Sequence, residues 1–387
     1  MARVLIDGRF VGVGESISRY TLELLKHILK IDRKNEYTLL VRPLGEEVLL
    51  ANYPDLIEVP NLQLSVLDVK HYSLDEQTKL LAYLNEEKFD LVHFTQFNHP
   101  IRYKRPFVIT IHDLTIFHHN MDQGWIKRMA FSRVMKSAVG RSSKIITVSD
   151  TTKRELVERY GISGSKVAVI YNGIDHSRYN KEVKSEKKRI DDFRTKYQIA
   201  EPYILYTGMW KQHKNLVRLL RAFENTYETE EMKGKVQLVL VGKVDDNERE
   251  VLAEIERINK KYGSLGFEAV RVTGYVDEWE LPLAYAEALA YVIPSLSEGF
   301  GMPPLEAMAC GTPVIASNAS CIPEVLGDAP LYFNPKSEKE MSEAMAKMVK
   351  DGKLRDKLRE QGLKQAQKYR WDEAAKEIHK IYRAVLQ

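Results

Sequence analysis

The chain has little of what would mark a disulfide scaffold, a zinc protein or a membrane span. Among its 387 residues only Cys310 and Cys321 are cysteines, and two thiols cannot form a tetrathiolate metal site. No apolar run approaches the roughly 18 residues that a membrane-spanning helix needs. Zinc-type Cys/His spacings, a Walker loop and the aromatic RNA-recognition motif are also missing. We therefore expect two buried thiols in a reducing compartment and no transmembrane helix.

An excess of charge of either sign is missing as well. The formal net charge is +4, which suits an anionic nucleotide-sugar or a membrane surface but is too small to indicate nucleic acid. The start Met-Ala-Arg-Val-Leu-Ile-Asp lacks the long apolar region of a signal peptide. We expect a cytoplasmic protein, with peripheral contact at the inner face of the cell membrane as one option.

What the chain does have is a regular alternation of short β-branched runs with longer amphipathic stretches, which is typical of βαβ units with parallel strands. The expected strands are residues 4–6, 37–41, 91–94, 107–111, 145–148 and 167–170, then 203–206, 236–241, 270–273, 291–293, 313–316 and 331–333. Between the two series, residues 181–189 form a charged run that indicates a connector or an exposed helix start. We predict an α/β protein of two doubly wound, Rossmann-like domains, residues 1–190 and 191–370, facing across a crevice where ligands bind at the carboxyl ends of the strands.

The most informative segment is Glu298-Gly-Phe-Gly-Met-Pro-Pro-Leu-Glu306. Gly299 and Gly301 let a ligand approach the main chain, and the two prolines after Met302 suit the first turn of a helix. The unpaired N–H groups of that turn would bind a diphosphate. Glu306, expected in the same first turn, would accept hydrogen bonds from ribose, and Glu298 would face the sugar. A glutamate in a first turn can also only complement the helix dipole, and a Gly-x-Gly turn can serve packing alone.

These two glutamates resemble the Glu-x7-Glu motif of retaining glycosyltransferases of family 4. Further segments resemble family landmarks in family order over nearly the whole chain: Thr110-Ile-His112-Asp113-Leu, Ile145-Ile-Thr-Val-Ser149, Tyr171-Asn-Gly-Ile-Asp175, Tyr206-Thr-Gly208 through Lys214-Asn215, Val272-Thr-Gly-Tyr-Val276 and Thr312-Pro-Val-Ile-Ala316. Within the family, the stretch from Asn318 to Pro335 is most similar to bacterial mannosyltransferases of surface-polysaccharide assembly. The resemblance implies the GT-B fold, with residues 1–190 on the acceptor side, helix 371–387 packing back on them, and residues 191–370 binding the nucleotide-sugar.

The resemblance implies cationic stabilisation of the leaving group. Lys214 lies just ahead of an amphipathic helix and matches the family lysine, so it would neutralise the departing diphosphate. The arginine that many relatives carry shortly before it is missing, so Lys211 or His213 would supply a second cation. Either lysine could otherwise be an ordinary solvated charge.

The base of the donor is expected to lie against Tyr275 and Val276, whose backbone could read its edge. The expected donor contacts together are Gly12, Gly14, Gly208, Lys211, Lys214, Tyr275, Val276, Glu298, Gly299, Phe300, Gly301, Met302 and Glu306.

The segment Asp7-Gly8-Arg9-Phe-Val-Gly12-Val-Gly14 follows the first expected strand. It departs from the dinucleotide fingerprint, because Ser16 and Ile17 occupy the place of the third glycine. The segment forms a tight strand-to-helix turn or, by the resemblance, also touches the donor phosphate and the acceptor.

His112 and Asp113 end a strongly apolar strand, which would point their side chains into the crevice. The resemblance places this pair beside the transferred sugar, with His112 contacting it and orienting the acceptor, whereas a histidine here could also be a hydrogen-bonded core residue. His118 and His119 are expected on a loop, either against the acceptor or as solvated surface.

The segment 123–149 has six basic residues and no acidic one. Its cations are Lys127, Arg128, Arg133, Lys136, Arg141 and Lys144, and Trp125, Met129, Phe131, Val134 and Met135 are interleaved with them. The pattern fits a helix on an anionic membrane surface and equally an ordinary helix with an apolar inner face.

The function expected from the resemblance is a retaining transfer of a hexose, mannose from GDP-mannose first, to a hydroxyl of a glycan or lipid-linked acceptor in surface-polysaccharide assembly. Glu298, His112 and Lys214 would be catalytic, with Glu298 gripping sugar hydroxyls rather than acting as a nucleophile, and neither a metal nor a cofactor would be needed. UDP-glucose or UDP-N-acetylglucosamine is the next donor choice. A nucleotide-sugar epimerase and a non-catalytic nucleotide-sugar-binding partner are the alternatives from other classes.

Overall fold

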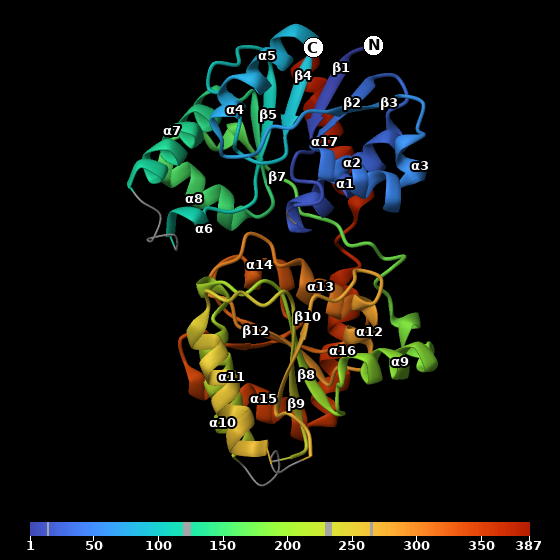
Figure 1. Ribbon diagram of the computed structural model, residues 1–387, viewed down its shortest axis with the longest axis vertical. Coiled ribbons are helices and arrows are strands. Elements are labelled where there is room, and N and C mark those ends of the chain that lie inside the picture. The colour runs from blue at the N-terminus through green and yellow to red at the C-terminus, as the bar shows by residue number, and fades with distance from the viewer. Residues whose placement is uncertain (14, 119–124, 229–233, 264–265) are drawn as a thin grey trace. The chain divides into compact units, whose positions relative to one another are not determined.

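The computed structural model describes residues 1–13, 15–118, 125–228, 234–263 and 266–387. It divides into two compact units (Figure 1), and each is described by itself. The first unit comprises Met1–Gly173 and Arg370–Gln387, and the second comprises Ile174–Tyr369.

The division lies before the position 190 expected from the sequence, because the chain joins the second unit as soon as it leaves the first. The N–H of Ile174 donates to the carbonyl of Tyr369 at 3.1 Å. Arg178 pairs with Glu278 at 2.9 Å, and Lys184 donates to the carbonyl of Gly311 at 3.2 Å. The charged run 181–189 is therefore part of the second unit. It forms a short 3₁₀ turn, Lys181–Ser185, and the start of helix α9 (Lys187–Tyr197).

The first unit is built on a parallel sheet with strand order β3-β2-β1-β4-β5-β6-β7. Its strands are β1 (Arg3–Asp7), β2 (Glu36–Val41), β3 (Leu62–Val66), β4 (Leu91–Phe94), β5 (Phe107–Ile111), β6 (Lys144–Thr147) and β7 (Val167–Val169). Its helices are α1 (Glu15–Ile31), α2 (Pro43–Asn52), α3 (Pro54–Ile57), α4 (Leu74–Gln77), α5 (Lys79–Glu87), α6 (Thr115–His118), α7 (Trp125–Arg141), α8 (Asp150–Tyr160) and α17 (Trp371–Leu386).

The second unit repeats the plan with strand order β10-β9-β8-β11-β12-β13, again parallel. Its strands are β8 (Tyr203–Thr207), β9 (Gln237–Val241), β10 (Val270–Gly274), β11 (Ala290–Ile293), β12 (Val314–Ser317) and β13 (Leu331–Phe333). Its helices are α9 (Lys187–Tyr197), α10 (Leu216–Tyr227), α11 (Arg249–Tyr262), α12 (Leu281–Ala286), α13 (Met302–Ala309), α14 (Ile322–Leu326), α15 (Glu338–Lys350) and α16 (Gly352–Ala366). The two parallel sheets confirm the predicted pair of doubly wound domains.

Strand β3 is missing from the sequence-based prediction. Its residues alternate between apolar and polar, with Leu62, Leu64 and Val66 separated by Gln63 and Ser65. Alternation of this kind marks a half-buried strand, and β3 lies at the edge of the sheet, paired with β2. The central strands, buried on both faces, read as continuous apolar runs and were therefore easier to find.

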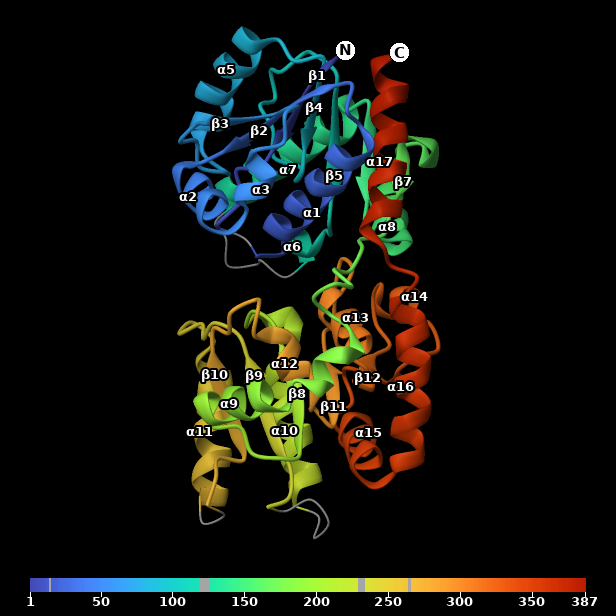
Figure 2. The same cartoon turned by 90° about the vertical axis from the view of Figure 1, so that its right-hand side faces the viewer.

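The last helix, α17, belongs to the first unit. It packs against α1 and β4 (Figure 2). Two buried polar contacts fix it there: the Tyr382 hydroxyl lies 2.5 Å from His93 Nδ1, and His379 Nε2 lies 3.1 Å from the carboxylate of Asp32. A helix distant in sequence thus completes the hydrophobic layer over the first sheet.

Both cysteines, Cys310 and Cys321, are buried free thiols, as the sequence predicted. In the described ranges, no helix combines the length and apolar character that a bilayer crossing requires.

Candidate functional site

In the second sheet the strand order reverses at β8: β9 and β10 lie on one side of it, and β11 to β13 lie on the other. The segments that follow the neighbouring strands β8 and β11 hold most of the predicted donor residues. In open α/β sheets such a switch point is where ligands bind. Asn215 ties the two segments together, because its side-chain amide donates to the carbonyls of Pro294 at 3.0 Å and Pro335 at 2.7 Å. Leu296 N–H also donates to the His213 carbonyl at 2.8 Å.

Lys214 and Glu298 form the centre of this site. Lys214 Nζ donates to Glu298 Oε1 at 2.7 Å and to Oε2 at 2.9 Å. Ser295 Oγ donates to the same Oε1 at 2.6 Å. The side chains of Lys214 and Glu298 are 19% and 11% exposed, so the pair is shielded from water but reachable from one side.

Burial alone would raise the pKa of Glu298. The positive charge and hydrogen bonds of Lys214, helped by the Ser295 hydroxyl and the charge of His213, outweigh it and hold this pKa below its ordinary value. Glu298 is therefore an ionised carboxylate near neutral pH.

The main chain of Glu298 is held as firmly as its side chain. Ser320 Oγ donates to the Glu298 carbonyl at 2.9 Å and accepts from the Glu298 N–H at 3.3 Å. The thiol of Cys321 donates to the same carbonyl at 3.1 Å. Ser320 itself has a φ of 57°, a conformation that a non-glycine residue adopts at some cost. From the sequence, Cys321 was expected only to be a buried thiol, and Ser320 was not singled out.

Helix α13 begins at Met302, with Gly301 as its N-cap at a φ of 86°, so the two prolines lie in its first turn as predicted. Glu306 does not: the first turn contains no acidic residue, and the placing of Glu306 there is wrong. The helix starts at Met302 because glycine adopts this φ readily, which puts Glu306 one turn further in. The Glu306 side chain is buried, and Oε2 accepts a hydrogen bond from the Tyr285 hydroxyl at 3.1 Å.

A buried polar network connects Glu306 with the end of β8. The Tyr285 hydroxyl also lies 3.0 Å from Thr207 Oγ1, and the Tyr291 hydroxyl lies 3.2 Å from the same oxygen. Burial, and then the negative charge of Glu306, hold the pKa of Tyr285 well above its ordinary value, so its hydroxyl stays a donor. No sequence pattern indicates this network, because its members come from four separate elements, β8, α12, β11 and α13.

Gly208 is placed by close packing of strand ends. A Cβ at position 242 would lie 2.2 Å from the Gly208 carbonyl oxygen. Gly208 N–H donates to the Val241 carbonyl at 2.9 Å, and Gly242 N–H donates to that of Gly274 at 3.0 Å. This close approach requires a glycine at 242. At Gly208, whose φ is 147°, a Cβ would lie 3.0 Å from the Tyr206 hydroxyl, and the donor contact predicted for Gly208 stays a prediction.

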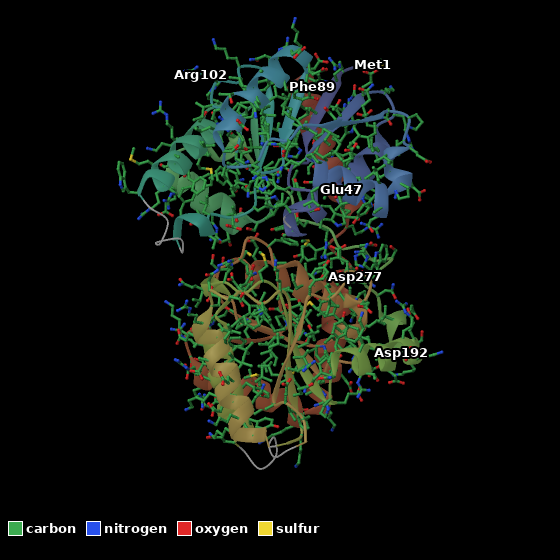
Figure 3. All side chains as sticks on the ribbon, in the orientation of Figure 1. Met1, Glu47, Phe89, Arg102, Asp192 and Asp277 are labelled. Atoms are coloured by element: carbon green, nitrogen blue, oxygen red, sulfur yellow. The ribbon has the colours of Figure 1, made fainter. Side chains whose placement is uncertain are left out.

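The remaining residues of the second unit that were predicted to contact the donor differ in exposure. Lys211 pairs with Asp245 at 2.7 Å, a partner that the sequence did not suggest. Tyr275 is 57% exposed, whereas Val276 is buried. The turn that follows them is fixed by Asp277, marked in Figure 3, whose Oδ1 accepts from the Trp279 N–H at 2.9 Å.

Phe300 and Met302 are both buried. The ring of Phe300 packs edge-on against Tyr369 at 5.5 Å. Their contribution to a donor site would come from the main chain, like that predicted for Gly299.

In the first unit, His112 and Asp113 follow β5. His112 Nε2 lies 3.0 Å from the Thr95 carbonyl, and the ring of Tyr20 packs edge-on against it at 4.8 Å. Burial lowers the pKa of His112, in spite of the Thr95 carbonyl and the charge of Asp113. Asp113 Oδ1 accepts from the Thr115 N–H at 2.8 Å at the start of α6.

Three other predicted residues lie in this unit. Gly12 has a φ of 80°, and a Cβ there would lie 3.2 Å from Leu44, so a side chain would be strained. Gly14 and His119 lie outside the described residues. His118 ends α6 rather than lying on a loop, because the chain turns into this short helix directly after Asp113.

Helix α7 carries the predicted basic segment from residue 125 to residue 141. Met135, Ala138 and Val139 are buried in the core of the unit, whereas Trp125 and Met129 are 70% and 62% exposed. Two of the predicted cations are structural: Arg141 donates to the carbonyls of Ile101 and Tyr103, and Lys144 Nζ donates to that of Ser165 at 2.6 Å. Arg128, Arg133 and Lys136 are exposed.

Solved structures with the same fold cover the whole chain. HepE from Anabaena, in complex with UDP-glucose, aligns with a TM-score of 0.75 and 17% identity over 99% of this chain and all of HepE. Sucrose-phosphate synthase from Thermosynechococcus elongatus aligns with a TM-score of 0.74 and 20% identity over 100% of this chain and 99% of that one. The fold is GT-B, as predicted.

Sequence relatives give the family. The family described as Glycosyltransferase Family 4 matches residues 17–178, and Glycosyl transferases group 1 matches residues 188–365. The O-antigen chain mannosyltransferase B of Escherichia coli is 30% identical over 305 residues, 78% of this chain and 76% of that protein. The O-antigen chain mannosyltransferase RfbU of Salmonella typhimurium is 30% identical over 64% of this chain and 62% of its own length. The chain belongs to glycosyltransferase family 4.

Proposed function

We propose that this glycosyltransferase moves mannose from GDP-mannose, with retention of configuration, to a hydroxyl of a glycan or lipid-linked acceptor in cell-surface polysaccharide assembly. The observation that carries the proposal is the Lys214–Glu298 pair at the switch point of the second sheet, 2.7 Å apart. The choice of mannose is supported by the two mannosyltransferases that are 30% identical to the chain.

Lys214 is suited to the leaving diphosphate. An ammonium group has three N–H donors, and two of them engage the oxygens of Glu298. The third is left for a phosphate oxygen, so Glu298 orients the cation without using up its hydrogen bonds. Charge that develops on the leaving group would be stabilised by a donor already in place, which is the largest single contribution in many enzymes.

Glu298 is suited to holding sugar hydroxyls. Its carboxylate is ionised, and both oxygens are already anchored by Lys214, and Oε1 also by Ser295. Carboxylate oxygens accept several hydrogen bonds each, so donor hydroxyls could join those present. An anchored carboxylate of lowered pKa is a poor nucleophile, which supports a direct transfer on one face of the sugar.

In that transfer the bond from the anomeric carbon to the diphosphate oxygen breaks through an oxocarbenium-like state. A new bond forms from the acceptor oxygen to the same face of the anomeric carbon. The acceptor's proton passes to the departing phosphate oxygen, so no further base, metal or cofactor is required for the balance.

His112 is suited to orienting a sugar hydroxyl. A carbonyl can only accept, so the contact with Thr95 puts the proton of the neutral ring on Nε2. The lowered pKa keeps the ring neutral, and Nδ1 is then an acceptor. In this tautomer Nδ1 would accept a hydrogen bond from a sugar hydroxyl and could not donate one.

Thermal-shift titration tests the donor. A ligand that binds only the folded protein raises its stability by mass action, so GDP and GDP-mannose are expected to raise Tm where UDP, UDP-glucose and UDP-N-acetylglucosamine do not. A response to the uridine ligands alone would contradict the mannosyl assignment. No response at millimolar concentration of any of them would contradict nucleotide-sugar binding and favour a non-catalytic role.

A uridine donor is the second candidate, and the observation that favours it is the bound UDP-glucose in the HepE structure of the same fold. HepE is only 17% identical to this chain, so the comparison supports the fold and not the donor. The mannosyltransferases, at 30% identity, are the stronger guide to the donor. The same titration distinguishes the two donors.

We also propose that α7 holds the enzyme at an anionic membrane surface, where a lipid-linked acceptor would be found. Trp125 and Met129 lie one helical turn apart and are exposed, and Arg128 and Arg133 are exposed nearby. Apolar side chains flanked by cations suit the headgroup region of an anionic bilayer.

Vesicle flotation tests this contact. The protein should float with vesicles that contain phosphatidylglycerol and not with phosphatidylcholine alone, and W125A with M129A should abolish flotation. L50A with L74A removes two other exposed leucines of the same unit, 57% and 84% exposed, and should leave flotation unchanged. Equal loss in both double variants would contradict the proposal.

A further inference from the structure

The glycine turn ahead of α13 contains a main-chain donor without a partner. Gly299 is buried, and in the part of the chain that the structure describes its N–H donates to no other group. Buried N–H groups of this kind are rare, because leaving one without a hydrogen bond costs free energy. A partner supplied by a bound ligand would account for this one.

Helix α13 offers few donors of its own. Its first three residues are Met302, Pro303 and Pro304, and proline has no N–H. Of the donors that a helix presents at its first turn, only that of Met302 remains among these three. An anion in front of α13 must therefore be held largely by the turn that precedes the helix.

The direction of the Gly299 N–H is set by the carbonyl of Glu298. The two groups belong to one planar trans peptide unit and point in opposite directions. The carbonyl accepts from Ser320 Oγ at 2.9 Å and from the Cys321 thiol at 3.1 Å. Two donors therefore hold the carbonyl towards the start of α14 and the Gly299 N–H away from it, and a peptide turned over would lose both bonds.

Ser320 makes these contacts in an unfavourable conformation. Its hydroxyl also accepts from the Glu298 N–H at 3.3 Å, so it engages both main-chain groups of Glu298. Its φ of 57° costs free energy in a residue with a side chain, and such strain is concentrated at functional sites. Because Ser320 is exposed, packing in the core does not account for its conformation.

We propose that Ser320 and Cys321 are positioning residues: they lock the Glu298–Gly299 peptide and so aim the Gly299 N–H at a phosphate oxygen of the donor. A hydrogen-bond donor that is fixed before the reaction stabilises developing charge without first having to be reoriented. Neither side chain needs to touch the substrate for this effect. The inference rests on the proposed function, because it names what prepares that site for the diphosphate of GDP-mannose.

NMR of the Gly299 amide tests the lock. The protein is labelled with 15N at its 21 glycines, and the signal is assigned by its loss in Gly299→Ala. The ligands are GDP and guanosine, which differ only by the diphosphate, so GDP should shift the wild-type signal and guanosine should not. In Ser320→Ala with Cys321→Ala the signal should broaden or split. GDP should bind this double variant about tenfold more weakly, through loss of a hydrogen bond to a charged group, and guanosine should bind it as it binds the wild type.

Two further variants serve as controls. Cys321→Ser keeps a donor for the Glu298 carbonyl and should bind GDP like the wild type. Ser185→Ala is the matched control, because Ser185 is an exposed serine of the same unit that donates to the Glu182 carbonyl at 2.6 Å. Its Gly299 signal and its GDP affinity should equal those of the wild type.

Equal GDP affinity in the wild type and the double variant overturns the lock. An equal loss for GDP and guanosine also overturns it, because general damage to the site would weaken both. If the double variant does not fold, Ser320→Ala decides, since this residue is exposed. GDP binding about threefold weaker with guanosine unchanged supports the proposal, and unchanged GDP binding overturns it. A wild type that binds no GDP overturns the proposed donor instead, which separates the two failures.

Discussion

The two units hold the same kind of charge pair in different surroundings, which fit a scaffold in the first unit and the proposed chemistry in the second. In the first unit, Arg9 and its partner Asp7 are 0% and 4% exposed, and their hydrogen bonds are directed at each other and at Glu76. In the second unit, Lys214 and Glu298 are paired at a similar distance but are 19% and 11% exposed, at the ends of two strands. The difference teaches that spare hydrogen-bonding capacity facing solvent, rather than charge as such, distinguishes a chemical group from a scaffold.

Removing the cation of the second unit should have the largest effect. Lys214→Ala takes away the donor proposed for the leaving diphosphate, and losses of about 10²–10³ in kcat are typical when one such donor is removed. We expect a loss of that size in transfer from GDP-mannose, measured by release of GDP.

Lys187→Ala is the control for that variant, since Lys187 belongs to the same unit, is 69% exposed, pairs with Glu287 at 2.7 Å and is not among the predicted donor contacts. Its kcat should stay within a few-fold of the wild type. A comparable loss in both variants would mean that the pair with Glu298 carries no special role.

Removing the cation of the first unit should instead act on folding. Arg9→Met leaves two buried carboxylates without their partner, which costs roughly 3–5 kcal/mol of unfolding free energy. Arg42→Met is the comparison, because Arg42 pairs at 3.3 Å with Asp68, which is 66% exposed, and such pairs contribute about 0–1 kcal/mol. Chemical denaturation followed by circular dichroism measures both, and equal stability of the two variants would contradict the assignment of Arg9 as a scaffold.

A third test uses pH on the contact that holds α17. Burial alone would raise the pKa of Asp32. Hydrogen bonds from the Tyr37 hydroxyl, the Lys34 N–H and Asn35 outweigh the effect of burial, and the pKa of Asp32 falls to about 2 from an ordinary 3.8. A depressed folded pKa stabilises the fold fully above the unfolded value, and the gain is lost as the pH falls from about 4 towards 2.

Loss of this titration should lower the free energy of unfolding of Asp32→Asn by at most about 2 kcal/mol relative to the wild type at pH 7. The difference between the two proteins should shrink as the pH is lowered. The exposed Asp55 provides the control, because Asp55→Asn should show no gap at either pH. A gap in Asp32→Asn that stays constant down to pH 3 would contradict the titration.

The smallest effect is expected from the network behind Glu306. Tyr285→Phe removes the hydroxyl that donates to Glu306 at 3.1 Å, at a cost of about 1 kcal/mol. If Glu306 binds ribose, KM for the donor should rise about fivefold with kcat unchanged, and discrimination against 2′-deoxy-GDP should fall. Tyr203→Phe loses a buried hydroxyl bonded to the Ala284 carbonyl and should leave this discrimination intact.

The features that could be predicted from the sequence are those that a local pattern of residues determines. The central strands and the prolines in the first turn of α13 follow from runs and motifs visible along the chain. The placing of Lys214 and Glu298 in one site came from the family resemblance. Sequence reasoning failed where several elements must meet. Tyr285 and the anchoring Cys321 gain their roles only through Glu306 and Glu298, which lie 21 and 23 residues away. Strand β3 was missed because its alternation spans only five residues.

The position of Glu306 shows the limit for a helix end. The glycine turn is visible in the sequence, but whether Met302 or a proline begins the helix depends on the φ of Gly301, which the sequence leaves open. A helix beginning one residue later, at Pro303, would have placed Glu306 in its first turn.

The way the chain passes between the units has a consequence for experiment. Ile174 and Tyr369, the first and last residues of the second unit, are hydrogen-bonded to each other at 3.1 Å, and a Cβ on Gly173 would lie 2.6 Å from the carbonyl carbon of Arg370. The second unit is therefore an insertion whose ends meet, and the gap left in the first unit is short enough for a few glycines to bridge. Residues 174–369 could be produced as one continuous piece and the remainder as another, so that nucleotide and glycoside binding are each measured on an isolated half of the enzyme.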